Sequence, residues 1–136
     1  MRLYPPIVGI TRSAAAGSQL GSHTLARRTM VIVSPYVLHR HRLLWSDPDL
    51  FEPGRFLKPP VNRYAYLPFG IGPRMCIGAA FAMQEAILAA AMVLKSFSIQ
   101  LASSPAVWPV HRLTLRPRDP LLMVTRPTAR DRMRWG

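Results

Sequence analysis

A stretch rich in glycine and proline, followed at once by a long apolar run, constrains the fold of this chain more than any other feature. Residues 68–73 read P-F-G-I-G-P. Glycine costs backbone entropy in a helix and proline lacks the amide donor, so this stretch predicts an irregular, tightly turning loop. The residues from Ala79 to Lys95 favour helix and include neither glycine nor proline. We therefore expect a helix over 79–97, with the loop ending at its N-terminus.

The only cysteine of the chain, Cys76, lies at or just before this expected helix N-terminus. Free amide groups and the positive end of the helix dipole favour a thiolate over a thiol there. Arg74 places a cation two residues before the sulfur, and Gly78 allows a flat object to approach the backbone two residues after it. These surroundings indicate a site that holds a negative sulfur.

Four roles are open for such a sulfur: a nucleophile, a redox thiol, a metal ligand or a buried structural cysteine. A protease-type nucleophile needs a nearby histidine base, and His39 and His41 are distant in sequence. We interpret these two histidines as surface or helix-end residues. No second cysteine or histidine stands near enough in sequence to complete a zinc site, which needs three or four protein ligands.

The segment F-G-I-G-P-R-M-C-I-G, residues 69–78, resembles the haem-binding loop of cytochromes P450, F-x-x-G-x-R-x-C-x-G. Every fixed position of that pattern is filled, by Phe69, Gly72, Arg74, Cys76 and Gly78. The resemblance implies that Cys76 is the axial thiolate ligand of the iron of haem b, a ligand that favours O–O cleavage.

The same resemblance assigns roles to the other loop residues. It implies that Arg74 pairs with a haem propionate and that Phe69 packs beside the sulfur. The glycines, Gly70 included, would let the loop lie against the porphyrin. Arg12 stands at about the distance after the K helix where the family has an arginine that reaches a propionate; its alternative is a solvated arginine at a strand end.

Two further segments resemble P450 motifs. R-L-Y-P-P, residues 2–6, is similar to the end of the K helix, where Arg2 matches the arginine of E-x-x-R and the glutamate would precede Met1. W-S-D-P-D-L-F-E-P-G-R-F, residues 45–56, is similar to the segment before the meander, and Arg55 matches the arginine that joins a buried salt-bridge triad. We expect Arg2 and Arg55 to meet without their carboxylate, at a cost of several kcal/mol.

The remaining segments predict short elements. We expect a strand at 29–33, a β-prone run at 7–10, a turn or loop at 14–22, a short helix at 34–42 and β-hairpins within 98–124. The fold class implied is α+β, mainly helical, and the C-terminal part of the P450 fold. It comprises the end of the K helix, a small β-sheet, a meander from residue 58 to 65, the cysteine loop, the L helix and terminal β-hairpins. We assign residues 1–125 to this haem-binding part and 126–136 to a basic, flexible tail.

Composition narrows the function classes. Apolar residues make up 49% of the chain, which argues against disorder. A net charge of +12 by itself suggests a nucleic-acid partner, but the arginines are scattered and not interleaved with aromatic residues. A single cysteine excludes an internal disulfide framework and, with no recognisable targeting segment, favours a cytoplasmic protein. We expect the tract 79–94, interrupted by Gln84 and Glu85, to be too short and too polar to span a membrane and to form a core helix.

The resemblance implies a haem-thiolate monooxygenase that activates O2 to hydroxylate or epoxidise a small organic substrate. A ferredoxin- or flavoprotein-type donor would supply electrons at the proximal face, with neither nucleic acid nor membrane as a partner. The N-terminal helices, the I helix and most of the distal pocket of the family are not in these residues, so we expect the isolated chain not to be competent. The alternatives are a non-catalytic haem-binding remnant, an inert product of a truncated gene, and a basic nucleic-acid-associated protein.

Overall fold

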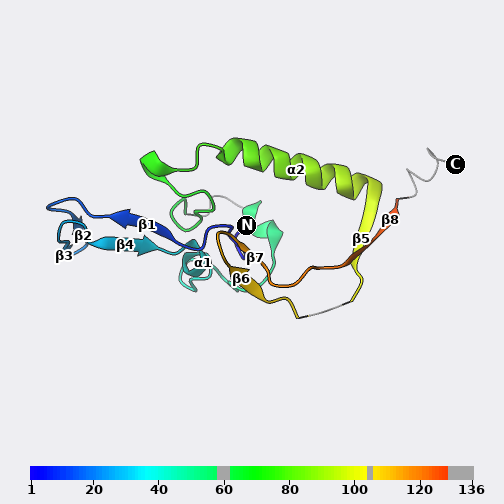
Figure 1. Cartoon of the computed structure of the whole chain (residues 1–136), viewed down its shortest axis with the longest axis horizontal. Helices are drawn as coiled ribbons and strands as arrows, with labels where there is room; N and C mark the ends of the chain where they lie inside the picture. The colour runs from blue at the N-terminus through cyan, green and yellow to red at the C-terminus, as the bar shows by residue number, and fades with distance from the viewer. Residues whose placement is uncertain (58–61, 104–105, 129–136) are drawn as a thin grey trace. The chain divides into compact units, whose positions relative to one another are not determined.

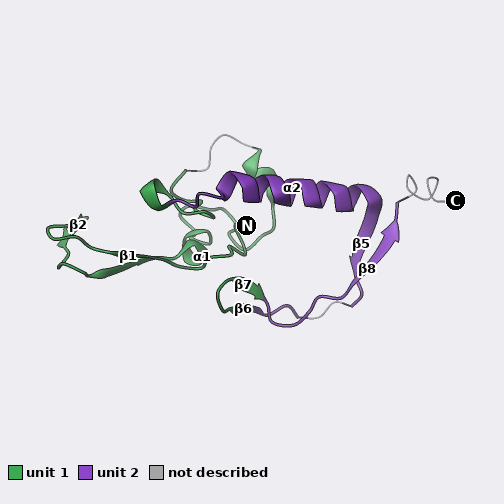
Figure 2. Ribbon diagram, turned by 45° about the horizontal axis from the view of Figure 1, so that its top comes forward, with its two compact units in different colours: residues 1–74, 111–116 green, residues 75–110, 117–136 purple. Residues whose placement is uncertain are grey.

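The computed structural model describes residues 1–57, 62–103 and 106–128, and it divides the chain into two compact units. Unit 1 comprises Met1–Arg74 with His111–Arg116, and unit 2 comprises the rest (Figure 2). Among the described residues, two α-helices of 4 and 18 residues accompany eight short strands (Figure 1). The expectation of a mainly helical part is therefore wrong for this portion of the chain, although small sheets and few helices are compatible with a part of the P450 fold.

Unit 1 begins with a long hairpin. Strand β1 (Ile10–Ser13) pairs antiparallel with β4 (Met30–Val33), with Ile10 opposite Val33. Two strands of two residues each, β2 (Gln19–Leu20) and β3 (His23–Thr24), lie between β1 and β4 in the sequence and pair with each other. The predicted strand at 29–33 is confirmed. The β-prone run at 7–10 instead yields a strand that starts at Ile10, where the ladder with β4 begins. The Val8 carbonyl before it accepts a hydrogen bond from the Ser34 hydroxyl at 2.7 Å. Within the predicted loop at 14–22, the short β2–β3 pair was not expected.

A short helix follows the hairpin. Helix α1 (Pro35–Leu38) has Pro35 in its first turn, and the Ser34 hydroxyl caps it by accepting from the Val37 amide at 3.3 Å. Proline suits this position because the amide it lacks has no partner within the helix. The helix ends at His39, so it is shorter than the predicted 34–42. Two 3₁₀ helices follow, η1 (Pro53–Phe56) and η2 (Gly72–Arg74).

The core of unit 1 is small and partly polar. Its buried apolar side chains include Trp45, Ala65 and Leu67 together with two prolines, and Arg2 and His39 are buried as well. Aromatic rings extend this core: Tyr66 lies 5.1 Å from Phe56 and 6.2 Å from Trp45, centroid to centroid. The core thus joins the N-terminal residues, the end of α1 and the segment that leads into the cysteine loop. Of the predicted meander, residues 58–61 lie outside the described residues.

Unit 2 is built on helix α2 (Ala79–Ser96), which confirms the helix predicted over 79–97 to within one residue. Strand β5 (Phe97–Leu101) continues directly from it and pairs antiparallel with β8 (Met123–Pro127). Strands β6 (Pro109–His111) and β7 (Leu115–Pro117) pair with each other, and their hairpin is divided between the units, since His111–Arg116 belong to unit 1. The predicted C-terminal hairpins are confirmed. Strand β8 runs two residues past the expected boundary at 125, and residues 129–136 of the expected tail lie outside the described residues.

Helix α2 carries no buried residue in unit 2. Its exposed apolar side chains include Phe81 at 72%, Ile87 at 59% and Met92 at 70% exposure. The expectation of a buried core helix is therefore wrong within the described structure. The expectation that it is too short and too polar to span a membrane is also wrong by length and composition alone, since its 18 residues have a mean hydropathy of 1.3. Core helices of soluble proteins pass the same test.

Candidate cofactor site

Two glycines give the cysteine loop its shape. Gly70 has φ of 75° and Gly72 has φ of 76°, both in the left-handed region that favours glycine. A Cβ atom added at Gly72 would meet no other atom within 4 Å, so its conformation, not crowding, selects glycine there. The loop enters from the buried Leu67 and closes in η2, which ends at Arg74. The pattern of glycines in the sequence thus corresponds to real backbone turns.

Cys76 presents an exposed thiol at the start of α2. Its carbonyl accepts from the Ala79 amide at 3.3 Å, which joins it to the first turn, and Gly78 stands at the N-cap. No side chain caps this N-terminus, so the positive end of the dipole of an 18-residue helix is not offset there by a side-chain acceptor. A Cβ atom added at Gly78 would lie 3.9 Å from Cys76 Sγ, which shows how close the backbone of Gly78 is to the sulfur.

The donor set of this site suits a metal that brings most of its own ligands. Within the described ranges, no group of three or more histidine, cysteine, aspartate or glutamate side chains is placed to hold a metal ion. One exposed sulfur, next to the exposed apolar side chains of Met75 and Ile77, instead matches a prosthetic group with an apolar face and a single protein ligand. The residues present therefore fit a flat prosthetic group such as a haem, and Cys76 is the one sulfur at this site that could serve as its protein ligand.

The other predicted cofactor contacts lie in unit 1. Arg74 is exposed at the end of η2, and the two ion pairs found among the described residues do not involve it. Phe69 is half-buried. Arg12 lies on β1 opposite Val31, and its guanidinium donates to the neighbouring Thr11 carbonyl at 2.8 Å. The boundary between the units falls between Arg74 and Met75, so Cys76 and Gly78 belong to unit 2.

Arg2 is buried, with 4% of its surface exposed, and its guanidinium binds main-chain carbonyls. Nη1 donates to the carbonyls of His39, at 2.7 Å, and Pro48, while Nη2 donates to the Leu50 carbonyl at 2.9 Å. Trp45 stacks against it, 5.1 Å from the guanidinium carbon to the ring centroid. Burial first, and then the nearby Arg55 and Arg40 cations, lower the pKa of Arg2 from its ordinary value.

Arg55 does approach Arg2, as the sequence predicted, but through a shared acceptor. Its Nη2 lies 3.5 Å from the same Leu50 carbonyl, and its Nη1 donates to the Ser46 carbonyl at 3.0 Å. The expectation that the two cations meet without a carboxylate made no allowance for main-chain acceptors. The carbonyl dipoles of segment 46–50 compensate part of the two positive charges.

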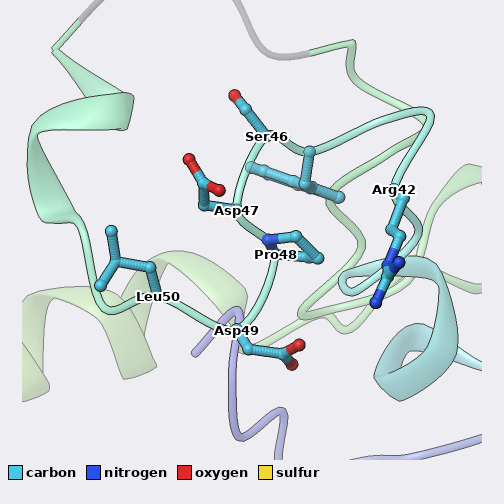
Figure 3. A pocket seen from close by; sticks show the side chains of 7 residues that line it. Arg42, Ser46, Asp47, Pro48, Asp49 and Leu50 are labelled. Carbon is cyan, nitrogen blue, oxygen red and sulfur yellow. The ribbon is translucent and has the colours of Figure 1, made fainter.

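Segment 46–50 also lines cavities in unit 1. One, of about 470 Å³, is surrounded by Arg42, Trp45 and residues 46–50, and Figure 3 shows the Asp47 and Asp49 carboxylates on different sides of Pro48. Two others, of about 620 and 640 Å³, are lined in part by Arg55 and by Arg2 respectively. Only these last two cavities adjoin a member of the Arg2–Arg55 pair, and none of the three is lined by Cys76.

His39 was missed by sequence reasoning, which treated it as a surface or helix-end residue. It does end α1, but its side chain is fully buried, whereas His41 is exposed as expected. Both ring nitrogens of His39 are in contact with main-chain atoms of distant segments. No local pattern signals this, because the partners are 37 and 28 residues away in sequence.

Comparison with known proteins bears on the identity of this loop. The cytochrome P450 family model matches residues 1–125, which is nearly the whole chain. The chain belongs to the cytochrome P450 family. P450s are haem-containing monooxygenases, so haem, iron and oxidoreductase chemistry come with the family.

Three relatives illustrate the match. Cytochrome P450 CYP749A22 of Panax ginseng is 36% identical over 133 residues, which are 93% of this chain and 25% of that protein. Putative cytochrome P450 132 of Mycobacterium tuberculosis is 38% identical over 127 residues, 92% of this chain and 28% of that protein. Cyclooctatin synthase of Streptomyces melanosporofaciens is 38% identical over 130 residues, 93% of this chain and 28% of that protein. The chain thus spans about a quarter of the length of the curated P450s it matches.

Proposed function

We propose that this chain is the haem-thiolate part of a P450 monooxygenase and that Cys76 is the axial ligand of the iron of haem b. One observation carries the proposal. The complete P450 loop motif presents an exposed thiol at Cys76 and ends at Gly78, the N-cap of an 18-residue helix that no side chain caps. The first turn of the helix offers backbone amide groups and the positive end of the helix dipole, which are the general features of a site that binds an anionic ligand.

The neighbouring residues prepare the loop for a flat, anionic group. Gly70 and Gly72 give the loop its left-handed turns, and Gly78 keeps side-chain atoms away from the sulfur. Arg74, exposed and outside both ion pairs of the described chain, is available to form charge-assisted hydrogen bonds with a propionate. Arg12 is the candidate for a second propionate contact, and Phe69 is the candidate for packing beside the sulfur.

A haem bound here supplies oxygen activation, and the residues of this chain hold it and stabilise its thiolate ligand. In the whole protein we propose that O2 and a small organic substrate are the reactants of a hydroxylation or epoxidation. We also propose a ferredoxin- or flavoprotein-type electron donor, whose acidic surface would complement the net charge of +12. Because the chain spans only about a quarter of the length of its relatives, we propose that these residues alone bind haem without turning over substrate.

Haem titration of the variant Arg74→Ala tests the proposal. A charge-assisted hydrogen bond contributes about 1.5–3 kcal/mol, so loss of Arg74 should weaken haem binding by about ten-fold or more. Arg63→Ala is the matched control, since Arg63 is an exposed arginine near the loop that stacks on its own neighbour Tyr64. The control should bind haem as the parent does. Equal haem affinity in parent and Arg74→Ala would show that Arg74 serves only to solvate the loop.

A further inference from the structure

His39 links three segments of unit 1 through a single imidazole ring. Its Nε2 accepts a hydrogen bond from the Leu67 amide at 2.8 Å, and its Nδ1 lies 3.2 Å from the Arg2 carbonyl oxygen. The ring is fully buried and lies 5.2 Å from the ring of Tyr66, centroid to centroid. Leu67 is also buried, and it stands two residues before Phe69, the first residue of the cysteine loop motif.

The partners of the two nitrogens fix the protonation state of the ring. A main-chain amide can only donate, so Nε2 must offer its lone pair to Leu67. A carbonyl oxygen can only accept, so Nδ1 must carry the hydrogen that is donated to Arg2. Only the neutral tautomer with hydrogen on Nδ1 makes both bonds. A proton added at Nε2 would point at the Leu67 amide hydrogen and break that bond.

The charges around the ring oppose protonation as well. Arg2 and the N-terminal amine approach from the N-terminal segment, Arg40 from the end of α1, and the phenol of Tyr66 from the segment before the loop. Burial chiefly, and then these three cations, lower the pKa of His39 from its ordinary value, while the hydrogen bond to the Arg2 carbonyl acts in the opposite direction.

We propose that neutral His39 is a positioning residue, which holds the start of the cysteine loop against the N-terminal segment, and that protonation of its Nε2 releases Leu67. The link itself does not depend on haem. Its consequence for the cofactor rests on the proposed function, because the loop that Leu67 anchors is the one assigned to haem.

The direction of the pH effect follows from the state of the ring. In the unfolded chain His39 becomes protonated as the pH falls through about 6.5, the ordinary pKa of histidine. In the folded chain His39 stays neutral at that pH, because its pKa is lowered. The unfolded state then binds the extra proton, so stability is full above about pH 6.5 and falls as the pH drops through the region below it. In that region the folding equilibrium constant should fall by up to ten-fold per pH unit, the limit for one proton.

Nitrogen NMR of the haem-free full chain, labelled with ¹⁵N at histidine and leucine and kept in mild detergent, tests the link directly. We expect His39 to show a protonated Nδ1 and an unprotonated, hydrogen-bonded Nε2, with the exposed His23, His41 and His111 as internal references. On acidification the Leu67 amide resonance should shift with the His39 ring. A hydrogen on Nε2, or a Leu67 amide that ignores the titration of His39, would overturn the proposal.

Variants provide the second arm. His39→Gln keeps an amide oxygen that can accept from Leu67 but cannot titrate, so its folding equilibrium should lose the pH dependence between 6.5 and 5 that the parent shows. His41→Gln, at an exposed position, should retain the parental dependence. Equal pH dependence in the parent and in His39→Gln would refute the proposal. If His39→Gln does not fold, the NMR measurement on the parent alone tests the proposal. Failure of haem to bind would contradict the proposed function. It would not affect the histidine NMR or the pH dependence of folding, which are both measured without haem.

Discussion

Arg2 is a buried cation whose charge is met by main-chain carbonyls. The carbonyls of His39, Pro48 and Leu50 converge on its guanidinium, and the Trp45 ring covers one side. Removal of the guanidinium takes a hydrogen-bond donor away from each carbonyl. A buried polar group without a hydrogen bond lowers the stability of the fold by about 1–3 kcal/mol. Arg2 therefore ties the first residues to the end of α1 and to segment 46–50.

Replacement of Arg2 by methionine should lower the free energy of unfolding by about 3 kcal/mol, because it removes the donor to the His39 and Pro48 carbonyls and leaves the Leu50 carbonyl only its long contact with Arg55. Arg55→Met is the control. Its hydrogen bonds are exposed, and its loss also removes a cation that disfavours the charged form of Arg2, so the change should be about 1 kcal/mol or less. Urea unfolding followed by circular dichroism measures both. Equal losses in the two variants would contradict the assignment of Arg2 as the central tie.

At the scale of single residues, the sequence was informative where chemistry is local. Cys76, Gly70 and Gly72 were recognised from a contiguous motif, and the left-handed φ angles of the two glycines agree with it. His39 was misjudged and the surroundings of Arg2 were not foreseen. Their partners come from segments that only the folded chain brings together, so neighbouring residues carry no signal of them.

The turn at Gly72 belongs to the scale of elements, because Gly72 is the first residue of η2 and its φ of 76° sets how the chain enters that 3₁₀ helix. A residue with a Cβ atom pays about 1–2 kcal/mol in the left-handed region. Gly72→Ala should therefore destabilise the chain by about that amount, although the new methyl group would meet no atom. Chemical unfolding detects the change.

Gly9→Ala is the matched control for that substitution. Gly9 has no positive φ, and its added Cβ atom would make only an ordinary contact, 3.7 Å from Ile32 Cγ2. This variant should match the parent or be slightly more stable. If Gly72→Ala were as stable as Gly9→Ala, the left-handed turn would not be what selects glycine in the loop.

Element positions followed the sequence wherever a breaker or a β-branched run marked them. For α2, the sequence places Gly78 directly before the helix and a run without glycine or proline within it. For β4, the β-branched residues mark the strand. The start of β1 was not predicted, since pairing with β4 decides which residues form the ladder. The exposure of α2 was not predicted either, because a sequence pattern states that a helix is apolar but not what covers it.

On the scale of the whole molecule, α2 leaves much of its apolar surface exposed within unit 2. Large exposed apolar patches promote association. The relatives are about four times longer than this chain, so a longer P450 has additional residues with which to cover such a helix.

We therefore expect the isolated chain to be poorly soluble and to turn over no substrate. The comparison is a version extended at its N-terminus by the corresponding part of a full-length relative, given the same redox partners. Light scattering reports solubility, and substrate-coupled NADH consumption reports turnover. Consumption by the short chain that equals that of the extended version would show the 136 residues to be an enzyme on their own.

If the sulfur of Cys76 binds haem iron, the absorption spectrum of the reduced, haem-loaded chain under carbon monoxide will show it. We expect the red-shifted Soret band of a thiolate ligand in the parent. In Cys76→Ser this band should be absent while the circular dichroism is unchanged, because serine is nearly isosteric and the thiol is exposed. A Cys76→Ser variant that retains the parental spectrum would contradict the account.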